Sequence, residues 1–129
     1  MLKVVPPRMV EPYLSGQRAV IAGYVYRARD CSLTGPASYY HTLALGYDGS
    51  DFTPDLAEVY VLRWRALDMS GSLLTPPLSP HGPIATVPEF YTLPAPIPVG
   101  AEMHRITTDA EDLVARYDGQ VWLRPIRRS

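Results

Sequence analysis

The chain has 129 residues, of which 47% are hydrophobic and 19% are charged. This length predicts a single domain with one core, and the apolar content excludes a disordered chain. Twelve basic and thirteen acidic side chains leave a formal net charge of −1. This balance gives no electrostatic reason to expect a nucleic acid or an anionic membrane as a partner.

The cysteine content and the start of the chain restrict its location. Cys31 is the only cysteine, which excludes an intramolecular disulfide, a C-x-x-C redox pair and a cysteine-built zinc site. The residues after Met1 lack the apolar core of a signal peptide, and no stretch is long enough to span a bilayer. We therefore expect a cytoplasmic protein without a membrane partner, and Met1 favours a complete chain over an excised domain.

The N-terminal part combines a proline-rich start with an apolar run. Residues 1–18 contain Pro6, Pro7 and Pro12, and proline disrupts both helix interiors and sheet ladders. We therefore expect an extended N-terminal arm. The run that begins at Ala19 is rich in β-branched and aromatic residues, which predicts a strand that leads from the core to a polar rim.

A short helix is predicted after this strand. Thr34 is a candidate N-cap, Pro36 suits the first turn, and Gly46 is a candidate stop signal. Tyr39 and Leu43 are four residues apart, so they share one helix face. We expect this face to belong to the core.

The segment 58–67 has the clearest strand pattern in the sequence. Along one of its faces the residues change from Val59 and Val61 to Arg63 and Arg65. This change predicts a strand that begins under cover and ends in solvent or beside an anion.

Prolines and a turn dipeptide organise the C-terminal half. Residues 75–98 contain eight prolines with interspersed apolar residues, which predicts an extended segment that packs as an edge strand plus a loop. Strands are predicted over 102–106 and 113–117, with a helical turn over 108–113 between them. The Asp-Gly dipeptide at 118–119 predicts the tight turn of a C-terminal hairpin.

Together these elements predict an α+β fold. We expect a single β-rich domain over residues 1–129, with a mainly antiparallel sheet, one or two short helices and a C-terminal β-hairpin. No repeat of fixed period is visible, which excludes solenoids and propellers.

The sequence lacks the common motifs of catalysis and metal binding. It contains no P-loop, no dinucleotide-binding glycine motif, no H-E-x-x-H and no G-x-S-x-G. His41, His81 and His104 are far apart and have no metal-ligand spacing. The aspartate-rich loop over 48–55 lacks the ligand pattern of an EF-hand. We therefore predict no metal site and no tightly bound cofactor.

One set of residues suggests nucleotide chemistry. Arg27, with Arg29 as its substitute, leaves the predicted early strand, and Glu89 lies among aromatic residues on a later extended segment. A guanidinium binds phosphate oxygens bidentately, and a carboxylate stabilises a ribosyl cation. The aromatic residues that can stack on a nicotinamide or adenine ring are Tyr24, Tyr40 and Phe90.

This order of residues resembles the ADP-ribosyltransferase and NAD-glycohydrolase toxin fold over residues 20–106. The resemblance implies that Arg27 holds a phosphate of NAD and that Glu89 acts at the nicotinamide ribose, with NAD as substrate. The sequence has no Ser-x-Ser triplet before Val59, and Val87 occupies the place of the first acid in the Glu-x-Glu doublet. These differences favour a glycohydrolase-like or inactive relative over a transferase. A toxin of this kind can be exported by a route without a cleaved signal.

Two alternatives stand beside this hypothesis. Arg27 can instead form an ion pair with Asp30 or Glu58 at the rim of a sheet. The chain can also be a non-enzymatic protein-interaction module, because the stiff segment 75–98 loses little entropy on docking and an open strand edge can pair with a partner strand. A homodimer through that edge is its simplest form.

Overall fold

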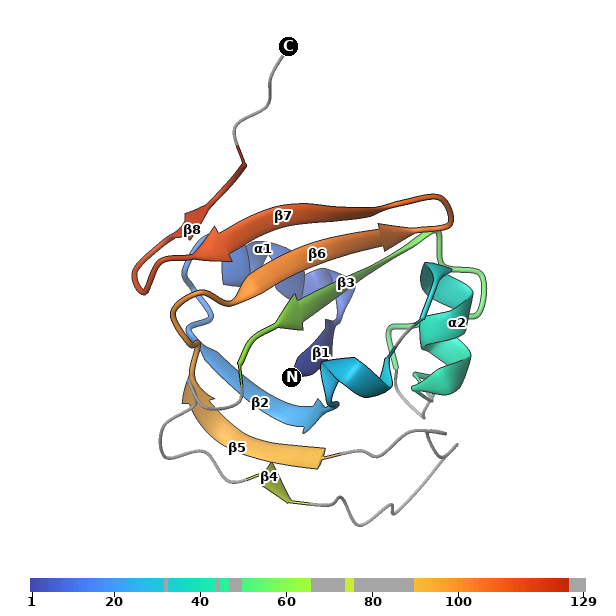
Figure 1. Cartoon of the computed structure of the whole chain (residues 1–129), viewed down its shortest axis with the longest axis horizontal. Helices are drawn as coiled ribbons and strands as arrows, with labels where there is room; N and C mark the ends of the chain where they lie inside the picture. Colours follow the sequence, from blue (N-terminus) through green and yellow to red (C-terminus); the bar gives the residue numbers. More distant parts are fainter. Residues whose placement is uncertain (32, 44, 47–49, 66–73, 76–89, 126–129) are drawn as a thin grey trace.

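Figure 1 shows the computed structural model, which describes residues 1–31, 33–43, 45–46, 50–65, 74–75 and 90–125. The described elements follow the order β1 (Leu2–Val5), α1 (Pro7–Leu14), β2 (Val20–Val25), η1 (Ala28–Asp30), α2 (Gly35–Thr42), β3 (Glu58–Arg63), β4 (Leu74–Thr75), β5 (Phe90–Pro96), β6 (Glu102–Thr107), β7 (Glu111–Tyr117) and β8 (Trp122–Leu123). Strands predominate, the helices are short, and these strands pair antiparallel. The predicted β-rich α+β fold is therefore confirmed.

The strands form two sheets. The larger sheet has the order β1-β3-β6-β7-β8, and the smaller sheet has the order β2-β5-β4. The two are joined where Leu2 of β1 and Tyr26, just after β2, exchange backbone hydrogen bonds of 2.7 and 2.8 Å. In Figure 1 the small sheet lies below the large one, and α2 lies at one side of it.

The large sheet is covered by apolar residues on both faces, so the domain has two apolar clusters where one core was expected. The inter-sheet cluster contains Val5, Val10, Tyr13, Ile21, Val25, Leu62, Trp64, Ala95, Ile97, Ala101 and Met103. The α2 cluster contains Leu2, Val4, Tyr26, Cys31, Tyr39, Leu43, Leu45, Phe52, Val59, Val61 and Ile106. Alternate residues of β3 enter the two clusters, with Val59 and Val61 on the α2 side and Leu62 on the inter-sheet side.

The prediction of an extended N-terminal arm is wrong, because this segment forms a strand and a helix. Residues 2–5 form β1, which pairs with β3, and α1 begins at Pro7 and continues through Pro12. A proline in the first turn removes no helical hydrogen bond, whereas Pro12, inside the helix, lacks the N–H donor and its ring crowds the carbonyl four residues earlier. Tertiary packing outweighs this loss, because Val10 and Tyr13 are buried and the Tyr13 hydroxyl donates to the Val20 carbonyl at 3.1 Å.

β2 and α2 are a strand and a helix, as predicted, but the register of the strand and the end of the helix were not predicted. The strand predicted from Ala19 pairs with β5 with a register shift between Ile21 and Gly23, where one β2 residue lies opposite two residues of β5. The φ angle of Gly23 is +94°. Glycine adopts this conformation without strain. The α2 helix ends at Thr42, before the predicted stop at Gly46, while Tyr39 and Leu43 are buried as predicted.

The described part of the proline-rich segment forms β5. At Tyr91 and Thr92 this strand pairs with β2 on one side and with β4 on the other. The prediction of an edge strand is therefore wrong at these two residues. Residues 76–89, over which the prediction also extended, lie outside the described residues.

The C-terminal strands follow their predicted order. β6, β7 and β8 are consecutive neighbours, and the hairpin turns at Gly119, where φ is +107°. The helical turn predicted over 108–113 is wrong, because β7 already begins at Glu111. Among the described helices, none is long and apolar enough to cross a membrane.

Candidate functional site

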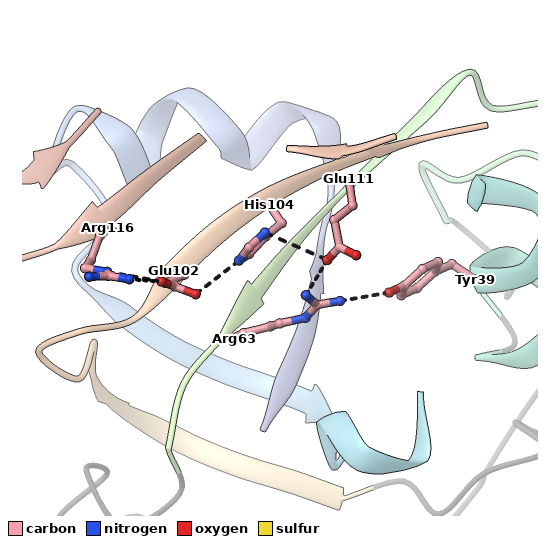
Figure 2. Close-up of polar contacts among 6 residues, drawn as sticks. All are labelled: Tyr39, Arg63, Glu102, His104, Glu111 and Arg116. Atoms are coloured by element: carbon pink, nitrogen blue, oxygen red, sulfur yellow. Dashed lines mark hydrogen bonds and ion pairs between the residues drawn. The ribbon is translucent and has the colours of Figure 1, made fainter. Parts of the chain in front are cut away.

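A histidine between two carboxylates lies on the α2 side of the large sheet (Figure 2). His104 Nε2 is 3.2 Å from Glu102 Oε1, and His104 Nδ1 is 3.8 Å from Glu111 Oε1. Glu102 and His104 are two residues apart on β6, so the strand period places them on one face. Glu111 reaches the same face from β7. The imidazole therefore has an acceptor near each of its ring nitrogens.

Two arginines extend this cluster in opposite directions. Arg63, at the end of β3, forms an ion pair with Glu111, and its Nη2 donates to the Tyr39 hydroxyl at 3.3 Å. Arg116 of β7 forms an ion pair with Glu102, with its Nε at 3.1 Å from Glu102 Oε2. The prediction that the basic end of this strand lies in solvent or beside an anion is confirmed, because Arg63 pairs with Glu111 and Arg65 is exposed. We call Tyr39, Arg63, Glu102, His104, Glu111 and Arg116 the sheet network.

One end of the sheet network opens into a hollow of about 550 Å³. We call it the arginine hollow; its lining residues are Met1, Ala28, Arg63, Trp64, Arg65, Val99, Gly100, Glu102 and Arg116. The lining thus includes three arginines and one glutamate. Arg63 is paired with Glu111 and Arg116 with Glu102, so Arg65 is the arginine of the hollow that has no ion-pair partner among the described residues. An unpaired guanidinium of this kind attracts an anion.

Two groups at the arginine hollow, the Glu102 carboxylate and the Met1 amino group, have lowered pKa values. The hydrogen bond from Arg116 lowers the pKa of Glu102, and the hydrogen bond from His104 lowers it further, so this carboxylate is ionised at neutral pH. Burial lowers the pKa of the Met1 amino group, which donates to the Trp64 carbonyl at 2.6 Å. The arginines, which stay protonated, therefore dominate the positive charge of the hollow at neutral pH.

The structure brings two of the residues predicted to bind NAD into contact. Arg27 Nε lies 2.8 Å from Asp30 Oδ2, which confirms the predicted alternative of an ion pair with Asp30. The Arg27 guanidinium also lies 5.5 Å from the centre of the Phe90 ring, in the range of a cation–π contact. Arg29, its predicted substitute, lies on η1, two residues after Arg27. Glu89, the predicted catalytic residue, lies outside the described residues.

The two tyrosines of the prediction lie on different elements. Tyr24 of β2 meets Tyr91 of β5 edge to face, with ring centres 5.6 Å apart. Tyr40 lies on α2, where its ring is 5.1 Å from that of His41, and it packs against the α2 cluster.

Cys31 has the environment of a structural thiol. It is 5% exposed within the α2 cluster, and burial raises the pKa of its thiol. The thiolate is the nucleophilic form of cysteine, so burial disfavours the reactive form of Cys31. In the described part of the chain, no group of three or more His, Cys, Asp or Glu residues is placed to hold a metal ion.

The sequence did not predict most residues of the sheet network as members of a site. The Glu102-x-His104 spacing was the available signal, because two polar residues in alternate positions of a strand share a face. The sequence predicted a helical turn at Glu111, and this prediction concealed that Glu111 lies on the same face of the sheet.

Comparison of the chain with protein-family models, with curated proteins and with solved structures found no match in any of the three.

Proposed function

We propose that the arginine hollow binds the phosphate groups of a small nucleotide, with NAD and ADP-ribose as the ligand class. The observation that carries this proposal is that three arginines line the hollow and that one of them, Arg65, is exposed and has no ion-pair partner among the described residues. Arginine binds phosphate oxygens bidentately. A volume of about 550 Å³ also lies within the range of small-molecule sites.

The position of the hollow relates this proposal to the NAD-consuming activity that the sequence resemblance implies. Ala28 lines the hollow and directly follows Arg27, whose guanidinium faces the Phe90 ring. A ligand whose pyrophosphate pairs with Arg63, Arg65 and Arg116 would extend towards this aromatic face. Glu89 directly precedes Phe90 in the sequence, and in this proposal it supplies the carboxylate that stabilises the ribosyl cation.

Arg65→Gln tests the proposal without disturbing the sheet network. Arg65 is exposed and forms no hydrogen bond or ion pair with the other described residues, so its replacement should leave the melting temperature unchanged. We expect NAD and ADP-ribose, but not nicotinamide alone, to raise the melting temperature of the wild-type protein. The variant should bind ADP-ribose about tenfold more weakly, because one charge-assisted phosphate contact is lost.

The matched control is Arg105→Gln. Arg105 pairs with Glu58 and lines a different hollow, so this variant should keep the wild-type affinity. Isothermal titration calorimetry at two salt concentrations measures the affinities for ADP-ribose. The difference in affinity between the wild-type protein and Arg65→Gln should be smaller at high salt. The proposal is wrong if neither nucleotide binds, or if Arg65→Gln and Arg105→Gln bind ADP-ribose equally.

A second candidate function, self-association, is favoured by an apolar surface on the small sheet. Tyr24, Tyr91 and Leu93 are exposed by 41%, 41% and 52%, and Tyr24 is the cross-strand partner of Tyr91. Two copies joined through this surface would bury all three side chains, and aromatic residues contribute strongly to interfaces. This surface replaces the strand edge from which the sequence predicted a homodimer.

Sedimentation velocity over a range of concentrations measures this association. We expect a dimer that Leu93→Ser weakens, with Val121→Ser as the control, since Val121 is similarly exposed, at 55%, but lies in the β7–β8 turn. A chain that stays monomeric at the highest concentration, or a dimer that Leu93→Ser does not weaken, would exclude this interface.

A further inference from the structure

A second hollow, of about 670 Å³, crosses the large sheet at β7. Its walls come from β3, β6 and β7 and from the two residues that follow β8. We call it the β7 hollow; it is lined by the polar residues Glu58, Tyr60 and Arg105, by the apolar residues Leu113, Val114 and Pro125, and by Arg124. Its volume lies within the range of small-molecule sites, and it shares no lining residue with the arginine hollow.

The three polar residues of the β7 hollow bind one another. Arg105 forms an ion pair with Glu58, and the Tyr60 hydroxyl forms a hydrogen bond with the same carboxylate. Burial, and then the charge of Glu58, raise the pKa of Tyr60, so the phenol keeps its proton at neutral pH and donates this bond. One positive and one negative charge thus balance each other, and this group of residues has no net charge with which to attract a ligand.

Arg124 is the charged residue of the β7 hollow that has no hydrogen-bond or ion-pair partner among the described residues. Its side chain is exposed. Leu123, the residue before it, pairs with Arg116 of β7, so the β8 ladder holds the backbone beside Arg124 in place. A guanidinium is protonated at every physiological pH. The hollow therefore presents a single positive charge that no described residue compensates, and this charge attracts one anionic group.

The remaining residues of the β7 hollow are apolar. Leu113 and Val114 are half-buried, Val114 packs against the inter-sheet cluster, and Pro125 is exposed. A ligand with a hydrocarbon part would remove this aliphatic surface from water, which stabilises the complex. A polyanion fits less well, because its further charges would meet an arginine that is already paired with Glu58. The lining thus favours a ligand with one negative charge and an apolar body.

We infer that the β7 hollow binds a small apolar monocarboxylate, whose carboxylate pairs with Arg124 and whose hydrocarbon chain packs on Leu113, Val114 and Pro125. The planar guanidinium matches a carboxylate with two parallel hydrogen bonds. One negative charge on the ligand balances the one unpaired positive charge of the hollow. This inference does not depend on the proposed nucleotide site, since the two hollows have separate linings.

NMR titration of the isotope-labelled protein with straight-chain carboxylates tests this inference. We expect hexanoate to shift the amide signals of Leu113, Val114 and Arg124 and to leave that of Gly100, in the arginine hollow, unchanged. Hexanoate should bind about tenfold more tightly than butanoate, because each added CH₂ group removes more apolar surface from water. Hexanol, which has the same chain and no charge, should bind about tenfold more weakly than hexanoate. If hexanoate leaves Leu113 and Val114 unshifted, or binds no better than hexanol, the inference is overturned.

Two variants separate the charged contact from the apolar one. Arg124→Gln should weaken the binding of hexanoate about tenfold and leave that of hexanol unchanged, because only the carboxylate contact is lost. Leu113→Ser should reduce the preference for hexanoate over butanoate to about threefold, because the chain meets less apolar surface. The matched control is Arg8→Gln, since Arg8 is exposed, pairs with Asp51 and lines neither hollow. Equal affinities of Arg124→Gln and Arg8→Gln for hexanoate would contradict the role of Arg124.

Discussion

Replacing Lys3 by Met is expected to raise the free energy of unfolding at pH 7 by about 3 kcal/mol, which is the free energy that corresponds to lowering the pKa from 10.5 to about 8. At pH 7 the folded protein holds a mostly charged amine in a largely buried position, and the unfolded chain holds the same charge in water. Methionine has a similar length and carries no charge, so it removes this cost.

The same substitution should remove a pH dependence of stability. Below pH 8 Lys3 is charged in both states, and its full cost is present. Between about pH 8 and pH 10.5 the folded state has released the proton while the unfolded state still binds it, so the free energy of unfolding rises with pH. Above about pH 10.5 the cost is gone. The advantage of Lys3→Met should therefore fall from about 3 kcal/mol at pH 7 towards zero.

Urea unfolding of both proteins at several pH values measures this difference. The comparison must be made between the two proteins, because burial also raises the pKa values of Cys31, Tyr39 and Tyr60. These acids keep their protons longer in the folded state, so they lower the stability of both proteins at high pH. An advantage of Lys3→Met that is the same at pH 7 and pH 10 would show that Lys3 titrates normally.

The second large effect is expected for Arg63→Met. This change leaves the buried Tyr39 hydroxyl without its donor and leaves Glu111 without its arginine, which should lower the free energy of unfolding by about 2 kcal/mol. It also removes one of the three guanidinium groups of the arginine hollow. We therefore expect the melting-temperature shift produced by ADP-ribose to be lost in this variant.

Two further variants separate these two roles of Arg63. Tyr39→Phe removes one hydrogen bond of the sheet network and leaves the hollow intact, so it should cost about 1 kcal/mol and keep ADP-ribose binding. Arg105→Met removes a guanidinium from the same sheet whose pair with Glu58 is more exposed, so its cost should be smaller than that of Arg63→Met. If Arg105→Met lowers the free energy of unfolding as much as Arg63→Met does, the contacts of Arg63 in the sheet network stabilise the fold no more than an exposed ion pair.

The sequence predicted those elements whose signals are local. β3 was recognisable from its alternation, α2 from its proline, its cap position and its four-residue spacing, and the C-terminal hairpin from the Asp-Gly turn. The N-terminal segment was misjudged because proline rules describe isolated helices and strands. In the folded chain, β1 gains a ladder with β3, and α1 buries Val10 and Tyr13.

The candidate site was less predictable than the fold. Arg27 was identified as a polar residue at the end of a strand, and the structure shows it paired with Asp30 and facing Phe90. Arg63 was expected in solvent or beside an anion, but the sequence could not identify that anion as Glu111, which is 48 residues away along the chain. Contacts of this kind depend on the registers of β3, β6 and β7 together, and a shift of one residue would turn their side chains to the opposite face.

The sequence by itself determined the class of the fold, the single lysine, the single cysteine and the near balance of charge, because these follow from composition and from short-range patterns. Only the tertiary structure decided which strands are neighbours. That choice places His104 between two carboxylates, gathers three arginines around one hollow and buries Lys3 beside Arg18. The physical reason is that burial and electrostatic coupling act through space, between residues that the chain brings together only when both sheets have formed.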